Sequence, residues 1–129
     1  MNKYGYLEPF YPSSSVLASL GLVHGKNRIV FKTTRVTLEA EIYLYKLSDK
    51  IIISDLDGTM TKTDIMGIVS NYRDINYIHD GYEIFINELC KNGYNIVWLT
   101  MRSMAMYNFS KKYINKYVKC EGALIPEPE

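Results

Sequence analysis

Apolar and polar residues alternate strictly along residues 36 to 45, the clearest pattern in the chain. The apolar positions are Val36, Leu38, Ala40, Ile42 and Leu44. A period of two over this length predicts a strand with one buried face and one face in water. Residues 28 to 34 form a second strand candidate just before it, so we expect an antiparallel hairpin. Because two strands cannot bury a face by themselves, this hairpin needs cover from further strands or from the following unit.

The segment before the hairpin predicts a short helix. Three serines, residues 13 to 15, come directly before an apolar run and can cap a helix. Gly21 follows and can end the helix, since glycine adopts the left-handed backbone common after helices. A turn over residues 24 to 27 then leads into the first strand, while residues 1 to 12 show no period and fit an irregular arm.

After residue 47 the pattern changes to buried strands alternating with amphipathic helices. The predicted elements are a strand at 50–54, a loop at 55–64, a helix at 81–92, a strand at 95–100, a helix at 103–118 and a strand at 123–125. The first of these strands is apolar on both faces, which is typical of a central parallel strand covered by helices. The order predicts an α/β fold, a partial doubly wound parallel sheet preceded by a short antiparallel hairpin unit. We expect two domains, residues 1–47 and residues 48–129.

Both helices of the second unit carry polar residues where they begin. Asp80 can cap the first of them, with Glu83 as its capping-box partner. Ser103 can cap the second in the same way. Each helix has one apolar stripe, which predicts that both pack on the sheet.

The composition fits a small globular protein. The 129 residues are 47% hydrophobic, and 15 basic residues nearly balance 14 acidic ones, for a net charge of +1. This balance gives no basis for nucleic-acid binding. The sequence also lacks any stretch of 18 uncharged apolar residues, so peripheral membrane contact would come from a local patch. The lysines of the last predicted helix could form one, although a solvated helix face is the simpler interpretation.

The two cysteines, Cys90 and Cys120, have neither CxxC spacing nor histidine partners at zinc spacing. We expect two reduced, structural thiols in a cytoplasmic protein, with a disulfide between them as the less favoured alternative.

Polar residues follow the first buried strand in a pattern that suggests chemistry. Asp55 and Asp57 stand two apart at the end of that strand, so we expect both carboxylates to point to the same side. Gly58 lets the backbone turn after them. Two neighbouring carboxylates are costly unless a cation neutralises them, and Mg²⁺ prefers such oxygen ligands. An ordinary turn is the alternative, but it does not require two acids and a threonine behind an apolar strand.

These residues resemble the DxDGT motif of haloacid dehalogenase-like phosphatases. The resemblance implies that Asp55 is the nucleophile, forming an aspartyl-phosphate, and that Asp57 is the general acid and base. It implies that the Asp55 carboxylate and the Asp57 main-chain carbonyl hold Mg²⁺. It also implies phosphate-binding roles for Thr59, and for Thr100 and Arg102 after the second buried strand. Thr100 could instead be a hydroxyl that closes a strand, and Arg102 a solvated surface arginine.

Further segments resemble the lipin family, in its LNS2 domain, from about residue 17 to residue 125. They are residues 25–31, 42–46, 49–54, 61–64 with Gly67, 79–81, 92–94 and Arg102. The resemblance implies an Mg²⁺-dependent phosphatidate phosphatase that converts phosphatidate to diacylglycerol. Its substrate would be phosphatidate or another phosphomonoester. It further implies a cytoplasmic protein that attaches peripherally to the endoplasmic reticulum or nuclear membrane.

The sequence departs from the lipin pattern in ways that keep other functions open. The third and fourth superfamily motifs, a basic residue and an acidic or amide group, would fall beyond Glu129. A second chain could then complete the core. The alternatives to an enzyme are a non-catalytic module that binds phosphatidate or a partner, and an inactive fragment of a longer lipin.

Overall fold

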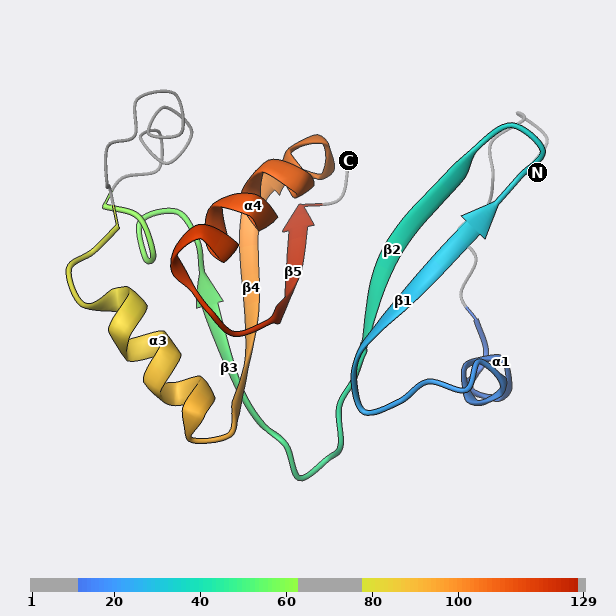
Figure 1. The fold of residues 1–129 in the computed structure, drawn as a ribbon, viewed down its shortest axis with the longest axis horizontal. Coiled ribbons are helices and arrows are strands. Elements are labelled where there is room, and N and C mark those ends of the chain that lie inside the picture. Colours follow the sequence, from blue (N-terminus) through green and yellow to red (C-terminus); the bar gives the residue numbers. More distant parts are fainter. Residues whose placement is uncertain (1–11, 63–77, 128–129) are drawn as a thin grey trace.

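The fold consists of a hairpin unit followed by a parallel sheet with its helices, as the computed structural model shows for residues 12–62 and 78–127 (Figure 1). The elements are α1 (Ser14–Ser19), β1 (Gly25–Lys32), β2 (Thr37–Leu44), β3 (Lys50–Asp55), α3 (Tyr82–Lys91), β4 (Tyr94–Ser103), the 3₁₀ helix η1 (Met104–Met106), α4 (Tyr107–Tyr117) and β5 (Gly122–Glu127). None of the described helices combines the length and the apolar character needed to cross a membrane.

Helix α1 is short and capped as predicted. The Ser13 hydroxyl accepts a hydrogen bond from the Val16 amide at 3.4 Å, and the Ser13 carbonyl accepts one from the Leu17 amide at 3.0 Å. Gly21 follows with a φ of 63°, a left-handed conformation that favours glycine. The serine run and the glycine are therefore sufficient to predict both ends of this helix.

Strands β1 and β2 form the predicted antiparallel hairpin, with Ile29 opposite Ala40. The first strand begins at Gly25, so most of the predicted turn at residues 24–27 belongs to the strand. The predicted buried face of β2 is wrong for the half next to the turn, where residues 37 to 40 are all exposed. Partial burial starts at Glu41, whose carboxylate accepts a hydrogen bond from Lys111 of the second unit. The hairpin thus gains cover only where that unit reaches it, as expected for two strands alone.

The second unit confirms the predicted fold class. Strands β3, β4 and β5 form a parallel sheet in that order, with Ile52 opposite Ile96 and Trp98 opposite Leu124. The chain runs strand, helix, strand, helix, strand, which is the α/β pattern read from the sequence. The carboxyl ends of the three strands therefore lie at one edge of the sheet.

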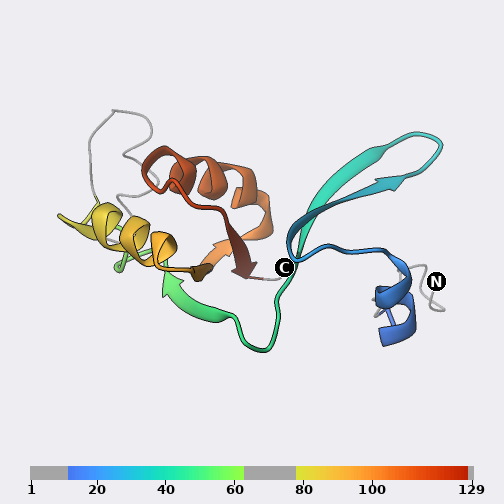
Figure 2. The same ribbon diagram turned by 60° about the horizontal axis from the view of Figure 1, so that its bottom comes forward.

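Both helices pack on the same face of this sheet (Figure 2). The shared core consists of Leu56, Met60, Ile78, Ile86, Ile96, Trp98, Tyr113, Ile114, Val118 and Leu124. The opposite face carries exposed apolar side chains, which are Ile51, Ile53, Leu99, Met101 and Ile125. Ile53 is 64% exposed and Met101 78% exposed. The expectation that β3 is a central strand covered on both faces is therefore wrong for the described residues, where β3 is an edge strand.

The two predicted helix caps are also wrong. Among the described residues, no side chain caps α3, which begins after Gly81 in a left-handed conformation with a φ of 82°. Asp80 instead forms an ion pair with Lys62 at 3.1 Å. Ser103 precedes η1 rather than an α-helix, and its side chain makes no capping bond there.

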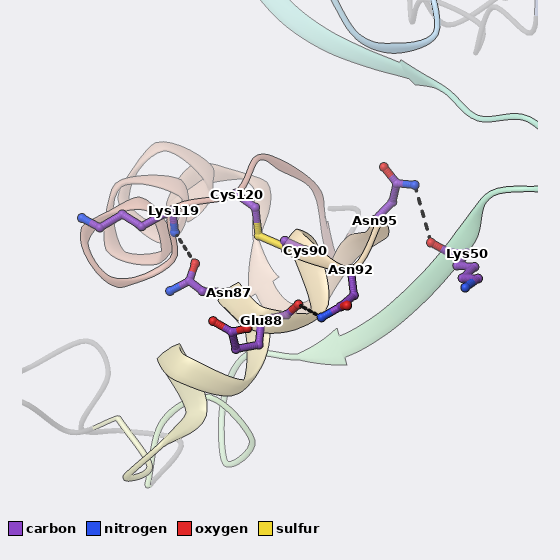
Figure 3. Close-up of a disulfide and its surroundings, with 8 residues drawn as sticks. All are labelled: Lys50, Asn87, Glu88, Cys90, Asn92, Asn95, Lys119 and Cys120. Atoms are coloured by element: carbon purple, nitrogen blue, oxygen red, sulfur yellow. Dashed lines mark hydrogen bonds between the residues drawn. A yellow bond between two sulfur atoms is a disulfide. The ribbon is translucent and has the colours of Figure 1, made fainter.

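The cysteines form a disulfide between Cys90, in the last turn of α3, and Cys120, between α4 and β5 (Figure 3). Their Cα atoms lie 6.3 Å apart. Beside the disulfide, the Lys119 amide donates to the Asn87 side chain at 2.8 Å. The prediction of two reduced thiols is therefore wrong, because packing α3 and α4 on one face brings together positions 30 residues apart in sequence.

A network of charged side chains joins the hairpin to the sheet unit. Lys111 of α4 donates to the Glu41 carboxylate at 2.9 Å and to the Gly122 carbonyl at 2.7 Å. Lys26 of β1 pairs with Glu41 and with Glu121, each at 2.9 Å. Lys111, predicted to lie on a solvated helix face, is thus largely buried, with 15% of its side chain exposed. Burial alone would raise the pKa of Glu41, but the bonds from Lys111 and Lys26 outweigh it and lower the pKa to about 2.

We expect Glu41→Gln to lower the free energy of unfolding by about 1–2 kcal/mol at pH 6, and much less at pH 2. The pKa of Glu41 is lower in the folded protein than in the unfolded chain. Its contribution is therefore complete above pH 4.5 and is lost as the pH falls toward 2. Urea unfolding of both proteins at pH 6, 4 and 2 measures the difference. A difference that does not shrink on acidification would contradict this assignment.

Candidate functional site

The loop after β3 is folded tightly at the carboxyl edge of the sheet. Leu56 is fully buried, and its carbonyl accepts hydrogen bonds from the amides of Met60 and Thr61, both at 3.1 Å. Gly58 has a φ of 77°, which turns the chain back and explains the need for glycine here. The Thr61 hydroxyl, also buried, lies 3.3 Å from the Gly58 amide. This arrangement holds Asp55 and Asp57 on the two sides of a buried leucine.

The carboxylate of Asp57 is held by two residues from the end of β4. Strand β3 ends opposite Leu99, whereas β4 continues to Ser103, so its last side chains flank the loop. Arg102 donates from Nε to Asp57 Oδ2 at 2.9 Å and from Nη2 to Oδ1 at 2.6 Å. The Thr100 hydroxyl donates to Oδ2 at 3.2 Å. Asp57 therefore sits in a two-pronged, charge-assisted pair that is strong and strongly directional.

The guanidinium of Arg102 is itself fixed from behind by α4. Its Nη1 donates to the Ser110 hydroxyl at 3.1 Å, and its Cζ lies 5.9 Å from the centre of the Phe109 ring. Ser110 is 1% exposed. Sequence reasoning missed Ser110, although a serine inside the apolar stripe of a helix was a usable signal, because a buried hydroxyl needs a partner.

The predicted site residues divide into two groups. Asp57, Thr100 and Arg102 are brought together by direct hydrogen bonds. Asp55 and Thr59 are exposed. The Asp55 carboxylate contacts its neighbour, since Oδ1 accepts from the Leu56 amide at 2.7 Å. Residues 63, 64 and 67 of the lipin-like segment lie outside the described residues.

The expectation that both carboxylates point to the same side assumed that the strand extends through Asp57. Strand β3 ends at Asp55, so the alternation of strand side chains does not continue to Asp57. The two acids consequently have different surroundings: one carboxylate faces water, and the other is 16% exposed and paired with Arg102.

The site can supply part of a magnesium shell. Within residues 12–62 and 78–127, no three His, Cys, Asp or Glu side chains are grouped to hold a metal. The Asp55 carboxylate is exposed, whereas the Asp57 carboxylate is paired with Arg102, so a magnesium ion here would use the Asp55 carboxylate and, as the resemblance implies, the main-chain carbonyl of Asp57. Mg²⁺ accepts one or two carboxylates together with water and substrate phosphate oxygens. The residues present fit such a partial shell.

Taken together, these features define an α/β protein whose polar site lies at the carboxyl ends of parallel strands, centred on two aspartates after β3. The family model named LNS2 (Lipin/Ned1/Smp2) matches residues 8–128 of this chain. The chain therefore belongs to the LNS2 family, which confirms the resemblance to lipins.

Individual relatives agree with this assignment. Phosphatidate phosphatase LPIN1 of Homo sapiens is 31% identical over 120 residues, covering 89% of this chain and 13% of the relative. Phosphatidate phosphatase PAH1 of Arabidopsis thaliana is also 31% identical, with the same coverage. Nuclear elongation and deformation protein 1 of Schizosaccharomyces pombe is 30% identical, covering 96% of this chain and 20% of the relative. The chain thus spans between about an eighth and a fifth of the length of these relatives.

Proposed function

We propose that this chain carries the nucleophilic half of a lipin-like, Mg²⁺-dependent phosphatidate phosphatase of the haloacid dehalogenase-like type. The observation that carries the proposal is the arrangement after β3, where an exposed Asp55 precedes an Asp57 held by Thr100 and Arg102. Relatives in the same family are named phosphatidate phosphatases, which supports the choice of substrate.

In the proposed reaction, an oxygen of Asp55 attacks the phosphorus of phosphatidate and the bond from phosphorus to the glycerol oxygen breaks. Asp57 enters this step in its protonated form and gives that proton to the leaving oxygen, which releases diacylglycerol. A water molecule then attacks the aspartyl-phosphate, Asp57 takes up its proton, and inorganic phosphate leaves while the Asp55 carboxylate is restored. Mg²⁺, held by the Asp55 carboxylate and the Asp57 carbonyl, would offset the negative charge of the phosphoryl group. Thr59 lies exposed in the same loop, where it can meet phosphate oxygens.

We expect Mg²⁺-dependent phosphate release from phosphatidate in mixed micelles, and its loss by more than about 1,000-fold in Asp55→Asn. The amide of asparagine cannot form the aspartyl-phosphate but keeps the size of the side chain. EDTA should abolish release by the wild-type chain. Asp49→Asn is a matched control, since Asp49 lies on the loop before β3 and pairs with His24. Release that is equal in wild type and Asp55→Asn would overturn the proposal.

We propose in addition that a second chain completes the core. The open face of the sheet, with Ile51, Ile53, Leu99, Met101 and Ile125 exposed, supports this, because parallel sheets are normally covered on both faces. If adding a polypeptide that carries the third and fourth superfamily motifs does not raise phosphate release above that of this chain alone, the proposal of a second chain is contradicted. Because phosphatidate is a membrane lipid, the proposed reaction takes place in peripheral contact with a membrane, for which we propose the endoplasmic reticulum or nuclear membrane.

One observation favours a second function, a module that binds phosphatidate without hydrolysing it. In the described part of the chain, no three His, Cys, Asp or Glu side chains lie close enough together to hold a metal ion. A binding module requires that wild type and Asp55→Asn sediment more with phosphatidate liposomes than with neutral liposomes. Equal sedimentation with both liposomes would exclude it.

A further inference from the structure

We propose that Arg102 is a positioning residue, anchored by Ser110, that fixes the Asp57 carboxylate so that Oδ1 is the atom that exchanges protons with the substrate. This inference rests on the proposed function for its catalytic meaning. It assigns to Arg102 a different role from the phosphate contact that its position in the sequence suggests.

The surroundings of Arg102 favour positioning over phosphate binding. Its side chain is 5% exposed, and each of its three nitrogens already donates a hydrogen bond, two to Asp57 and one to Ser110. Three of its five N–H groups are thus engaged, and a phosphate group would have to reach the other two on a buried side chain that α4 contacts. Asp57, in contrast, is 16% exposed and lies on the outer side of the pair.

The hydrogen bonds also identify the oxygen of Asp57 that remains available. A carboxylate offers about four acceptor sites, two on each oxygen. Oδ2 accepts from Arg102 Nε and from the Thr100 hydroxyl, while Oδ1 accepts from Arg102 Nη2. Among the described residues, one acceptor site thus remains, on Oδ1. The planar fork of arginine holds the carboxylate in this rotation, which a lysine, with a single ammonium group, cannot do.

Thr100 contacts Asp57 directly, and Ser110 contacts Arg102, so both support the same geometry. The Thr100 hydroxyl accepts from the Arg102 amide at 3.2 Å while it donates to Asp57, so it links the main chain of β4 to the carboxylate. Ser110 holds Nη1 from the opposite side. Among the described residues, Ser110 forms no hydrogen bond with Asp55 or Asp57. Its effect on turnover would therefore have to pass through Arg102.

The kinetic test compares Arg102→Lys and Ser110→Ala with the wild-type chain in phosphatidate hydrolysis with Mg²⁺. We expect kcat to fall about 30-fold in Arg102→Lys and about 5-fold in Ser110→Ala, with KM within about 3-fold, because a misplaced reacting group slows turnover without weakening binding. Arg28→Lys is the matched control, since Arg28 pairs with Glu39 on the exposed hairpin, and it should change neither constant. A raised KM with unchanged kcat in Arg102→Lys would make Arg102 a phosphate ligand and overturn the proposal.

A second readout does not depend on turnover. The Nε–H proton of Arg102 should give an NMR signal that exchanges slowly with water in the wild type, weakens in Ser110→Ala and is lost in Asp57→Ala. If the wild-type chain releases no phosphate, the proposed function fails, and this signal alone decides whether Arg102 fixes Asp57. A signal that exchanges as fast as that of Arg28 would overturn the pairing. Cooperative melting of each variant shows that the comparison is made on folded protein.

Discussion

Alanine at position 122 should lower the free energy of unfolding by about 3 kcal/mol, although it adds only one methyl group. Gly122 begins β5 and lies opposite Ile96 of β4. A Cβ placed there would overlap the Ile96 carbonyl oxygen and the ring of Trp98. Trp98 is 1% exposed and closely packed, so neither neighbour can move away without disturbing the core. Urea or thermal unfolding of Gly122→Ala measures the loss.

Gly93→Ala is the matched control for this prediction. It makes the same chemical change between α3 and β4, where a Cβ would meet nothing within 4 Å. Its φ of 81° is unfavourable for alanine, so we expect a loss of about 1 kcal/mol from backbone strain alone. If both variants lose the same amount, the contact between Gly122, Ile96 and Trp98 is not as close as the structure indicates.

Serine at both Cys90 and Cys120 should lower the free energy of unfolding by about 3 kcal/mol. The disulfide closes a loop of about 30 residues, and cross-linking a loop of this length restricts the unfolded chain by about 3–4 kcal/mol. The closed loop contains the end of α3, β4 and α4. The disulfide therefore links the last turn of α3 to the segment just before β5 (Figure 3). Urea unfolding under oxidising conditions compares the double variant with the wild type.

Reductant supplies the internal control for this prediction. Dithiothreitol should bring the wild-type midpoint down to that of the double serine variant and leave the variant unchanged. Intact mass should show two hydrogens fewer in the oxidised wild type than in the reduced protein. Suppose the wild type has the oxidised mass before reduction and its unfolding midpoint does not change with dithiothreitol. The disulfide would then contribute little to the free energy of unfolding.

The two stability predictions and the Arg102 proposal concern one structural unit. Gly122 lies opposite Ile96, near the start of β4, the disulfide closes the segment that contains β4, and Arg102 lies near the end of the same strand. Strand β4 is the central strand of the described sheet and the most buried. The position of the Asp57 carboxylate therefore depends on the packing of β4 between β3, β5 and the two helices.

Several features followed from the sequence alone because their causes are local. Period-two alternation predicted β2, and the serines and Gly21 predicted α1. Apolar strands alternating with amphipathic helices predicted a parallel sheet and the order of its strands and helices along the chain, and placed Asp55, Thr100 and Arg102 at strand ends. Each of these inferences depends on repeats or spacings of a few residues, which the backbone geometry of strands and helices translates directly into structure.

Other features were decided by contacts between segments far apart in the chain. The sequence did not indicate that α3 and α4 pack on the same face of the sheet, which brings Cys90 next to Cys120. It also did not indicate that α4 places Ser110 against the guanidinium of Arg102. It placed Arg102 near the acid pair, but only the extra length of β4 beyond β3 turned its guanidinium onto Asp57. Sequence spacing thus determined which residues reach the edge of the sheet, whereas packing of the helices on it determined which of their atoms meet.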